Sequence, residues 1–396
     1  MERLATLILG CFLAALSLNI FAAEERPPIL SQEEETRFQN QLKVLVELVA
    51  HIDLYALDRP QDIASCVTEM MAMRRLGKCR DKFSYYIPPE EVEEQEENIK
   101  GEFGGIGLEL TQKDGIIIVV APMDGTPAAR TGFKPEDIIL KVDGKEVESL
   151  NQAVRLIRGP AGGKVEIEIF RKGSEEPVKL VVMREKIIIH AVKSRDVTAN
   201  GQKIGVIKIN QFSETASGEF KEALTQIKKR NIKTAVLDFR NNPGGLMNEA
   251  LRMLALFMKP KDVAITYRDR HSTISYDAAY LRLELGIRSF GEFRGLKIVV
   301  LINKGSASAS EIFAGTMKDW GYPVVGEKSF GKGVGQNVFT LSDGSAFALT
   351  TFEFLVGNSR VPIRDKGVSP KYEVLNQDNS EKDLPMEKAI EILSRR

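Results

Sequence analysis

The segment Gly305-Ser306-Ala307-Ser308-Ala309-Ser310-Glu311-Ile312-Phe313-Ala314-Gly315 joins an apolar run to an amphipathic one. The run 298–302 predicts a buried strand, and the apolar periodicity of 312–320 predicts a helix. Ser308 is therefore expected at a strand-to-helix turn. Small residues at such a turn let a hydroxyl project, while amides of the helix N-terminus face developing negative charge. Acyl transfer requires this geometry, and Ser308 is the candidate nucleophile.

A serine nucleophile needs a base, and the sequence offers histidine or lysine. None of the three histidines, His51, His190 and His271, lies in a small-residue or Gly-rich segment. Lys332 lies in Phe330-Gly331-Lys332-Gly333-Val334-Gly335-Gln336, where apolar neighbours can exclude water and lower the pKa of the lysine. We favour Lys332 as the base, and a surface lysine in a glycine loop is the alternative.

A third segment, Val236-Leu237-Asp238-Phe239-Arg240-Asn241-Asn242-Pro243-Gly244-Gly245, predicts a strand that ends in a turn of unusual backbone freedom. A helix is expected to follow over 247–257. The bare amide of Gly244 or Gly245, together with that of Ala309, would form an oxyanion hole facing Ser308.

Together the three segments resemble the carboxy-terminal processing proteases, the PDZ-containing Ser-Lys endopeptidases of peptidase family S41. The matching pieces are Asp-x-Arg-x-Asn-Pro-Gly-Gly at 238–245, Ser-Ala-Ser-Ala-Ser-Glu at 306–311, and Gly-Glu-Lys-Ser-Phe-Gly-Lys-Gly with its following Gln at 326–336. The resemblance implies Ser308 as nucleophile, Lys332 as general base and Gln336 as the residue that orients the lysine. It implies no cofactor.

Other serines compete with this assignment. Ser306 and Ser310 flank Ser308, and the resemblance places the reactive hydroxyl on the middle serine. Ser329 and Lys332 also form a Ser-x-x-Lys pair, as in penicillin-binding proteins and β-lactamases. That motif opens a helix, whereas the glycines around Lys332 oppose a helix by about 1 kcal/mol each relative to alanine. A penicillin-binding type of acyltransferase is therefore the weaker alternative.

Residues 101–186 alternate short β-rich runs with turns and resemble a PDZ domain. The resemblance places the carboxylate-binding loop at Gly104-Gly105-Ile106-Gly107-Leu108, where free amides receive a chain terminus beside an edge strand. Arg158 is a candidate for connecting this domain to the catalytic domain. An adaptor that binds C-terminal tails without cleaving them is a second class of function for such a chain.

The composition indicates an α/β multidomain protein. Its 396 residues are 43% hydrophobic, enough for several cores, and its 55 basic and 55 acidic residues give no attraction to nucleic acid. No paired Cys or His metal motif is present in the sequence. We expect a helical N-terminal region, which the resemblance assigns to dimerisation, then a PDZ domain, an α/β sandwich protease core and a helical tail, at 30–100, 101–186, 187–372 and 373–396.

The N-terminal residues 1–23 predict a signal peptide and export to the periplasm, because 4–23 are almost wholly apolar and follow Arg3. An uncleaved anchor in the inner membrane is the alternative, since about 20 apolar residues can span a bilayer. Cys66 and Cys79 would pair in that compartment or stay as buried thiols. By the resemblance, the partners would be proteins with disordered apolar C-termini, copies of the chain in a homo-oligomer, and an activating adaptor protein.

Overall fold

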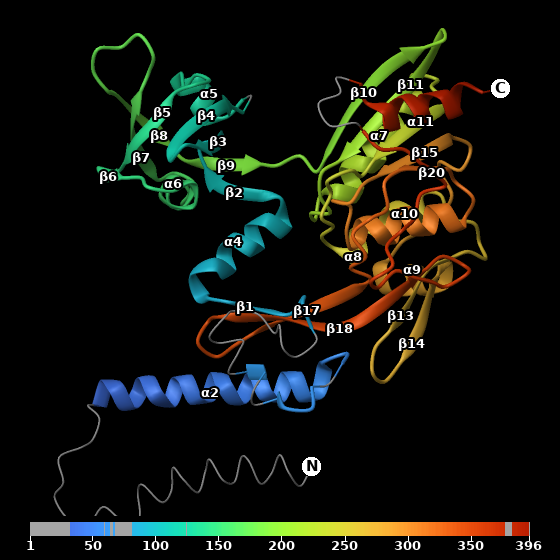
Figure 1. Cartoon of the computed structure of the whole chain (residues 1–396), viewed down its shortest axis with the longest axis horizontal. Coiled ribbons are helices and arrows are strands. Elements are labelled where there is room, and N and C mark those ends of the chain that lie inside the picture. The colour runs from blue at the N-terminus through green and yellow to red at the C-terminus, as the bar shows by residue number, and fades with distance from the viewer. Residues whose placement is uncertain are drawn as a thin grey trace, which may run out of the picture.

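The computed structural model describes residues 32–58, 60–63, 66–67, 81–123, 125–376 and 382–395. Figure 1 shows a small β-rich unit beside a larger α/β body, with a long N-terminal helix below both. The expected leader and Cys79 lie outside the described residues, whereas Cys66 is buried and disulfide-bonded. In the part of the chain that is described, no helix is both long and apolar enough to cross a membrane.

The larger body is built on a six-stranded sheet that is mostly parallel, which accounts for the apolar runs of its central strands. Its spatial order is β10 (Val192–Ala199), β11 (Gln202–Ile209), β12 (Thr234–Asp238), β15 (Lys297–Ile302), β16 (Val324–Gly326) and β20 (Tyr372–Glu373), with β10 alone antiparallel to its neighbour. The neighbours β12 and β15 end at one edge of the sheet. The segments 239–245 and 303–308, which follow these two strands, therefore meet there.

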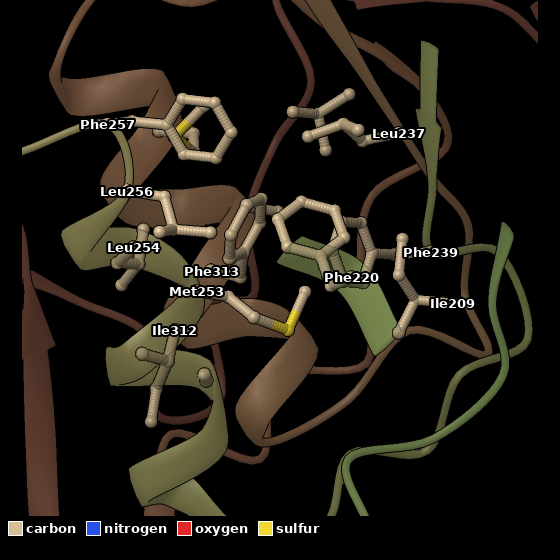
Figure 2. Packing of buried hydrophobic residues seen from close by; sticks show 14 of the residues in the cluster. Ile209, Phe220, Leu237, Phe239, Met253, Leu254, Leu256, Phe257, Ile312 and Phe313 are labelled. Carbon is tan, nitrogen blue, oxygen red and sulfur yellow. The ribbon is translucent and has the colours of Figure 1, made fainter. Parts of the chain in front are cut away.

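Helices cover both faces of this sheet. Residues of α7 (Ala216–Lys229), α8 (Met247–Ala255) and α10 (Ala309–Asp319) share one buried apolar cluster with the sheet, and residues of α11 (Leu384–Ser394) share another. Figure 2 shows the first cluster around Phe313 of α10, whose ring centroid lies 4.7 Å from that of Phe239 and 6.0 Å from that of Phe220. This packing fixes the start of α10, where Ser308 lies.

A second sheet packs against the first cluster and makes the body a sandwich. It has the order β1 (Tyr85–Ile87), β18 (Ala346–Val356), β13 (Val263–Arg268) and β14 (Thr273–Asp277), while β17 (Val334–Thr340) and β19 (Val361–Pro362) also pair with β18. The helix α2 (Gln32–Tyr55) packs on β18 through a cluster that includes Leu48 and Phe347. The region expected to be helical thus also contributes a strand, β1, to the protease core.

The small unit has the PDZ architecture that the sequence predicts. Its sheet runs β3 (Leu108–Lys113), β4 (Ile116–Pro122), β5 (Ile138–Val142), β7 (Lys164–Phe170) and β8 (Val178–Met183), with β6 (Lys145–Glu146) on β5 and the helices α5 (Pro127–Thr131) and α6 (Leu150–Ile157). It is entered from α4 (Pro89–Lys100) through β2 (Glu102–Gly105) and left through β9 (Glu185–Ile188). Because β3 ends this sheet, one side of its backbone has no strand partner among the described residues.

Candidate active site

Ser308 immediately precedes α10 and has an unusual backbone. Its φ is 55° and its ψ is −116°, in a region that a serine seldom occupies. Such a conformation costs about 1–3 kcal/mol and persists only where the surrounding structure enforces it. The side chain is partly exposed. The turn therefore presents this hydroxyl outward, as the sequence predicts.

The two flanking serines are used structurally. Both are fully buried. The Ser306 hydroxyl donates to the Phe239 carbonyl at 2.9 Å and accepts from the Asn303 amide at 3.0 Å. The Ser310 hydroxyl donates to the Asn242 carbonyl at 2.9 Å. These bonds hold the turn together and leave Ser308 as the accessible serine of the three.

Glu311 is a buried carboxylate that joins the nucleophile turn to the lysine loop. Its Oε2 accepts from the amides of Ser308 and Lys332, each at 2.9 Å. Its Oε1 accepts from the Gly331 amide and the Ser329 hydroxyl, each at 2.6 Å. Glu311 lies in the motif at 306–311, but no role for its side chain was predicted from the sequence. An acidic residue three positions after a helix N-cap is the signal that could have indicated one.

Lys332 points to Gln336. The Lys332 Nζ donates to the Gln336 Oε1 at 2.8 Å, and the Gln336 Nε2 donates to the Phe83 carbonyl. A β-bulge between Gly335 and Gln336 turns this side chain toward the lysine, so no helix is needed to bring the two together. Burial lowers the pKa of Lys332, while the charge of Asp81 and then that of Glu311 oppose the fall.

The Pro-Gly-Gly turn packs directly on the serine turn. Gly244 has a φ of 106°, and a Cβ there would lie 2.8 Å from the Ser308 Cβ, so only glycine fits. The Gly244 amide donates to Asn242 Oδ1 at 2.9 Å and is thus engaged. Within the described residues, the amides of Gly245 and Ala309 donate to no acceptor. Gly244 or Gly245 was predicted to supply an amide of the oxyanion hole, and Gly245 is therefore the one whose amide is available.

A charged network anchors the same motif to the C-terminal helix. The Arg240 guanidinium donates to Asp238 Oδ2 at 2.7 Å and to the two Asp383 oxygens at 2.7 and 2.9 Å. The Lys208 ammonium lies 3.4 Å from Asp238 Oδ1. Burial raises the pKa of Asp238, but its bonds to Arg240 outweigh burial and hold that pKa below its ordinary value. These residues support the turn from the side opposite Ser308.

The rival catalytic groups lie in other environments. His51 contacts the Glu47 carbonyl at 2.6 Å, and His190 lies 3.6 Å from Glu219. Among the described residues, no histidine contact involves Ser308. Ser329 is buried, and its hydroxyl is held by Glu311 and by the Val368 amide at 2.7 Å, in a segment that is not helical. The Ser-x-x-Lys pair therefore lacks the helix that the penicillin-binding interpretation requires.

The PDZ loop faces the linker helix α4. Within the described residues, the amides of Ile106 and Gly107 donate to no acceptor. The Gly104 amide donates to Glu97 of α4 at 3.1 Å. Arg158 lies 3.3 Å from Glu94 and 3.6 Å from Glu97. Arg158, the candidate for connecting the PDZ domain to the catalytic domain, thus contacts α4. The described residues hold no cluster of His, Cys, Asp or Glu that fits a metal.

The fold and site together define a class. An α/β core carries a serine at the start of a helix and a partly buried lysine tied to the same turn, and it is joined to a PDZ domain. This combination defines a PDZ-containing serine peptidase. Residues 203–374 match the model of peptidase family S41, and residues 118–171 match that of a PDZ domain.

Relatives and solved structures agree with this class. Over 307 residues the chain is 37% identical to a CtpA-like serine protease of Staphylococcus aureus, covering 75% of this chain and 59% of that one. A CtpA-like serine protease of Staphylococcus haemolyticus is 33% identical over 317 residues, with 79% and 61% covered. The chain thus spans less than two thirds of the length of these relatives.

Two solved structures share the fold at low identity. The photosystem II D1 C-terminal processing protease is 24% identical with a TM-score of 0.52, covering 90% of this chain and 97% of that one. An S41-type protein of Bacteroides fragilis is 15% identical with a TM-score of 0.56, covering 88% and 97%. The chain carries a peptidase domain of family S41 at 203–374, with a PDZ domain before it.

Proposed function

We propose that the chain is a serine endopeptidase that cleaves proteins near their C-termini. The observation that carries the proposal is the shared carboxylate of Glu311, because one oxygen accepts hydrogen bonds from the amides of both Ser308 and Lys332. These bonds hold together the two turns that carry a partly exposed hydroxyl and a lysine of lowered pKa. A serine and a neutral lysine are the two groups that acyl transfer needs.

Acylation begins with a proton transfer. Neutral Lys332 takes the hydroxyl proton of Ser308 as the serine oxygen attacks the scissile carbonyl carbon. The carbonyl oxygen becomes an oxyanion, which the amides of Ala309 and Gly245 would stabilise at the helix N-terminus. The C–N bond then breaks, and the protonated Lys332 gives its proton to the leaving amine. Gln336 holds the lysine in position throughout.

Deacylation reverses the roles. Lys332, neutral again, takes a proton from a water molecule that attacks the ester carbon of the acyl-enzyme. A second oxyanion forms and collapses, the bond to Ser308 breaks, and the serine oxygen recovers the proton from Lys332. The products are two shorter chains, and the cycle requires no cofactor.

The PDZ domain would select the substrate. We propose that the free amides of Ile106 and Gly107 bind a C-terminal carboxylate. The adjoining residues, Gly105 and Leu108, would shape the loop. The tail would then pair with the open edge of β3. Only a disordered tail can add a strand in this way, so folded proteins would be spared. An apolar tail suits the partly buried side chains of Leu108 and Leu110 near this edge.

We further propose export to the periplasm and self-association. The leader at 1–23 motivates the first, with an uncleaved anchor at the inner membrane as the alternative, and the N-terminal region motivates a homodimer or higher homo-oligomer. An activating adaptor protein completes the proposed partners. Cell fractionation and light scattering of the purified chain test these points; a cytoplasmic location, or a monomer at all concentrations, contradicts them.

The test of the activity is mass spectrometry of an unstructured protein with an apolar C-terminus after incubation with the enzyme. We expect cleavage by the wild type, and none by Ser308→Ala or Lys332→Ala, with all three equally folded by circular dichroism. Lys328→Ala is the matched control, because Lys328 is an exposed lysine in the same loop. Activity near wild type in Ser308→Ala or Lys332→Ala would contradict the dyad.

An adaptor that only binds tails is the second candidate, favoured by the unengaged amides of the PDZ loop. It predicts that the wild type binds the same protein and releases it intact. Binding measured by fluorescence anisotropy, alongside the mass spectra, separates this outcome from proteolysis.

A further inference from the structure

The segment 81–84 of the N-terminal region lies against the catalytic lysine. It leads into β1, which pairs with β18 in the register Tyr85 with Ala348. On the other side of β18 runs β17, which carries Gln336. The pairing of β1 therefore delivers residues that lie far from the catalytic motifs in sequence to the edge of the active site.

Phe83 contacts both members of the lysine pair. Its carbonyl accepts a hydrogen bond from Gln336 Nε2, which turns Gln336 Oε1 toward the lysine. Its ring centroid lies 5.6 Å from Lys332 Nζ. The same ring meets that of Phe330 edge-on, at 6.4 Å between centroids. One residue thus fixes the orienting amide and covers the ammonium group.

The backbone of Phe83 is held in place by Asp81. The carboxylate of Asp81 accepts from the amides of Phe83 at 3.0 Å and Ser84 at 3.2 Å, and from the Thr350 hydroxyl at 3.1 Å. The Thr350 amide donates in turn to the Ser84 hydroxyl at 2.8 Å. These bonds fasten the segment to β18, so the position of the ring is built into the sheet.

A polar cavity adjoins Phe83. This cavity of about 140 Å³ is lined by Phe83 together with Asp81, Lys82 and Arg364, among others. Loss of the ring would extend this polar space toward Lys332. The ring is therefore the apolar partition between the general base and a polar cavity.

The charges that face Lys332 are two carboxylates, Asp81 and Glu311, which favour the protonated lysine, while the ammonium of Lys82 lies 5.1 Å from the same ring. A ring face also attracts a cation. Burial is nevertheless the largest influence on the pKa of Lys332 and lowers it. Exclusion of water thus outweighs both attractions.

We propose that Phe83 is a positioning residue for the reaction. It comes from the N-terminal region and completes the lysine site, because its ring covers Lys332 and its backbone carbonyl holds Gln336. The proposal rests on the proposed function, because it concerns the base of that reaction. It makes the N-terminal region part of the catalytic unit.

The test is the pH dependence of kcat/KM for the full chain and a tail substrate, in wild type, Phe83→Tyr, Phe83→Leu and Phe83→Ala. Activity rises with pH as Lys332 loses its proton. A more hydrated lysine has a higher pKa, so it becomes the neutral base only at a higher pH. For Phe83→Ala we expect the inflection to move up by about one pH unit, which lowers the rate at pH 7 about tenfold and restores it in alkali. Phe83→Tyr keeps the ring and the wild-type inflection.

Phe83→Leu keeps most of the volume and folds even if Phe83→Ala does not, and it shows a smaller shift of the same sign. Phe290→Ala is the matched control, because it removes a ring centred 5.5 Å from the Arg282 guanidinium elsewhere in the core; its inflection stays at the wild-type pH. The inference is overturned if the inflection stays at the wild-type pH in both Phe83→Ala and Phe83→Leu. If the alanine variant does not fold, an unmoved inflection in Phe83→Leu alone overturns it. Cleavage by Ser308→Ala in the same assay overturns the proposed function instead.

Discussion

Two of the junctions at which carboxylates join separate parts of this chain differ in their surroundings. Glu311 lies fully buried between the serine turn and the lysine loop, with four donors on its two oxygens. Glu94 and Glu97 of α4 instead meet a single guanidinium, that of Arg158, with the Glu94 side chain 45% exposed. The Glu311 junction is shielded from water, and each carboxylate oxygen accepts two hydrogen bonds. The Arg158 junction is open to water.

The difference assigns different tasks to the junctions. A buried, fully bonded carboxylate admits one arrangement of its donors, because any other leaves polar groups without partners. A hydrated ion pair exchanges its partners for water at little cost. The catalytic groups are thus held rigidly, whereas the PDZ domain is attached to α4 by contacts that can be broken and remade. The following predictions probe this contrast.

The largest effect is expected at the buried junction. Glu311→Gln places an NH₂ group against two of the four donors, and each unsatisfied buried donor costs about 1–3 kcal/mol. We expect a loss of about 4 kcal/mol in the free energy of unfolding, and at least about a 100-fold fall in kcat/KM because the serine and lysine loops separate. Urea denaturation and kinetics measure the two. Glu222→Gln, on the exposed face of α7, is the control and stays near wild type.

A junction of intermediate burial should give an intermediate effect. Arg240 bridges Asp238, which is buried, and Asp383, whose side chain is 43% exposed. Arg240→Ala removes the guanidinium from the buried carboxylate and leaves it with Lys208 and the backbone amide of residue 240, and we expect about 3 kcal/mol of destabilisation by thermal unfolding. Asp383→Ala removes only the exposed partner and should cost about 1 kcal/mol. Equal losses in both variants would contradict this ranking by burial.

The hydrated junction should matter little to stability. Arg158→Ala is expected to change the free energy of unfolding by less than about 1 kcal/mol, because the pair is partly exposed and screened. Faster amide hydrogen exchange in α4 is expected, with exchange in α10 unchanged. Arg155→Ala, an exposed arginine on α6, provides the control. A loss as large as that of Glu311→Gln would mean that the two junctions are alike.

The smallest effect is expected for an exposed ion pair at the surface. Lys179 lies 3.3 Å from Glu166, with side chains 62% and 44% exposed, and 3.7 Å from Glu168. Lys179→Ala should change the free energy of unfolding by less than about 0.5 kcal/mol, and by less at high salt than at low salt. Chemical denaturation at two ionic strengths checks this. A change above about 1 kcal/mol would show that the exposure of these contacts does not determine the order of their contributions to the free energy of unfolding.

The sequence predicted the elements whose signals are local. The apolar runs at β12 and β15 and the helical periodicity of α10 are visible in the residues themselves, because parallel central strands and buried helices need them. The position of Ser308 at the junction of β15 and α10 follows from the same patterns. The alternation of short β-rich runs and turns predicted for 101–186 corresponds to the strands β2 to β8.

What the sequence did not predict depends on contacts between distant residues. The bond from Gln336 to the Phe83 carbonyl joins positions 253 residues apart, and no periodicity reports it. The strand β1 was missed because three residues in a polar, helical neighbourhood give no alternation to detect. The engagement of the Gly244 amide by Asn242 is a local side-chain turn, which a motif does not distinguish from a free amide.

The ribbon of β2 and β9 has a consequence for engineering. Glu102 lies opposite Ile188, and Gly105 opposite Glu185, so the chain leaves the core and re-enters it at neighbouring points. Paired strands hold such positions about 5 Å apart. The whole PDZ domain is therefore inserted between two adjacent strands. If the domain were removed, a tight turn between Gly105 and Glu185 would close the gap. The same two strands form a graft site at which a different recognition module could be exchanged for it.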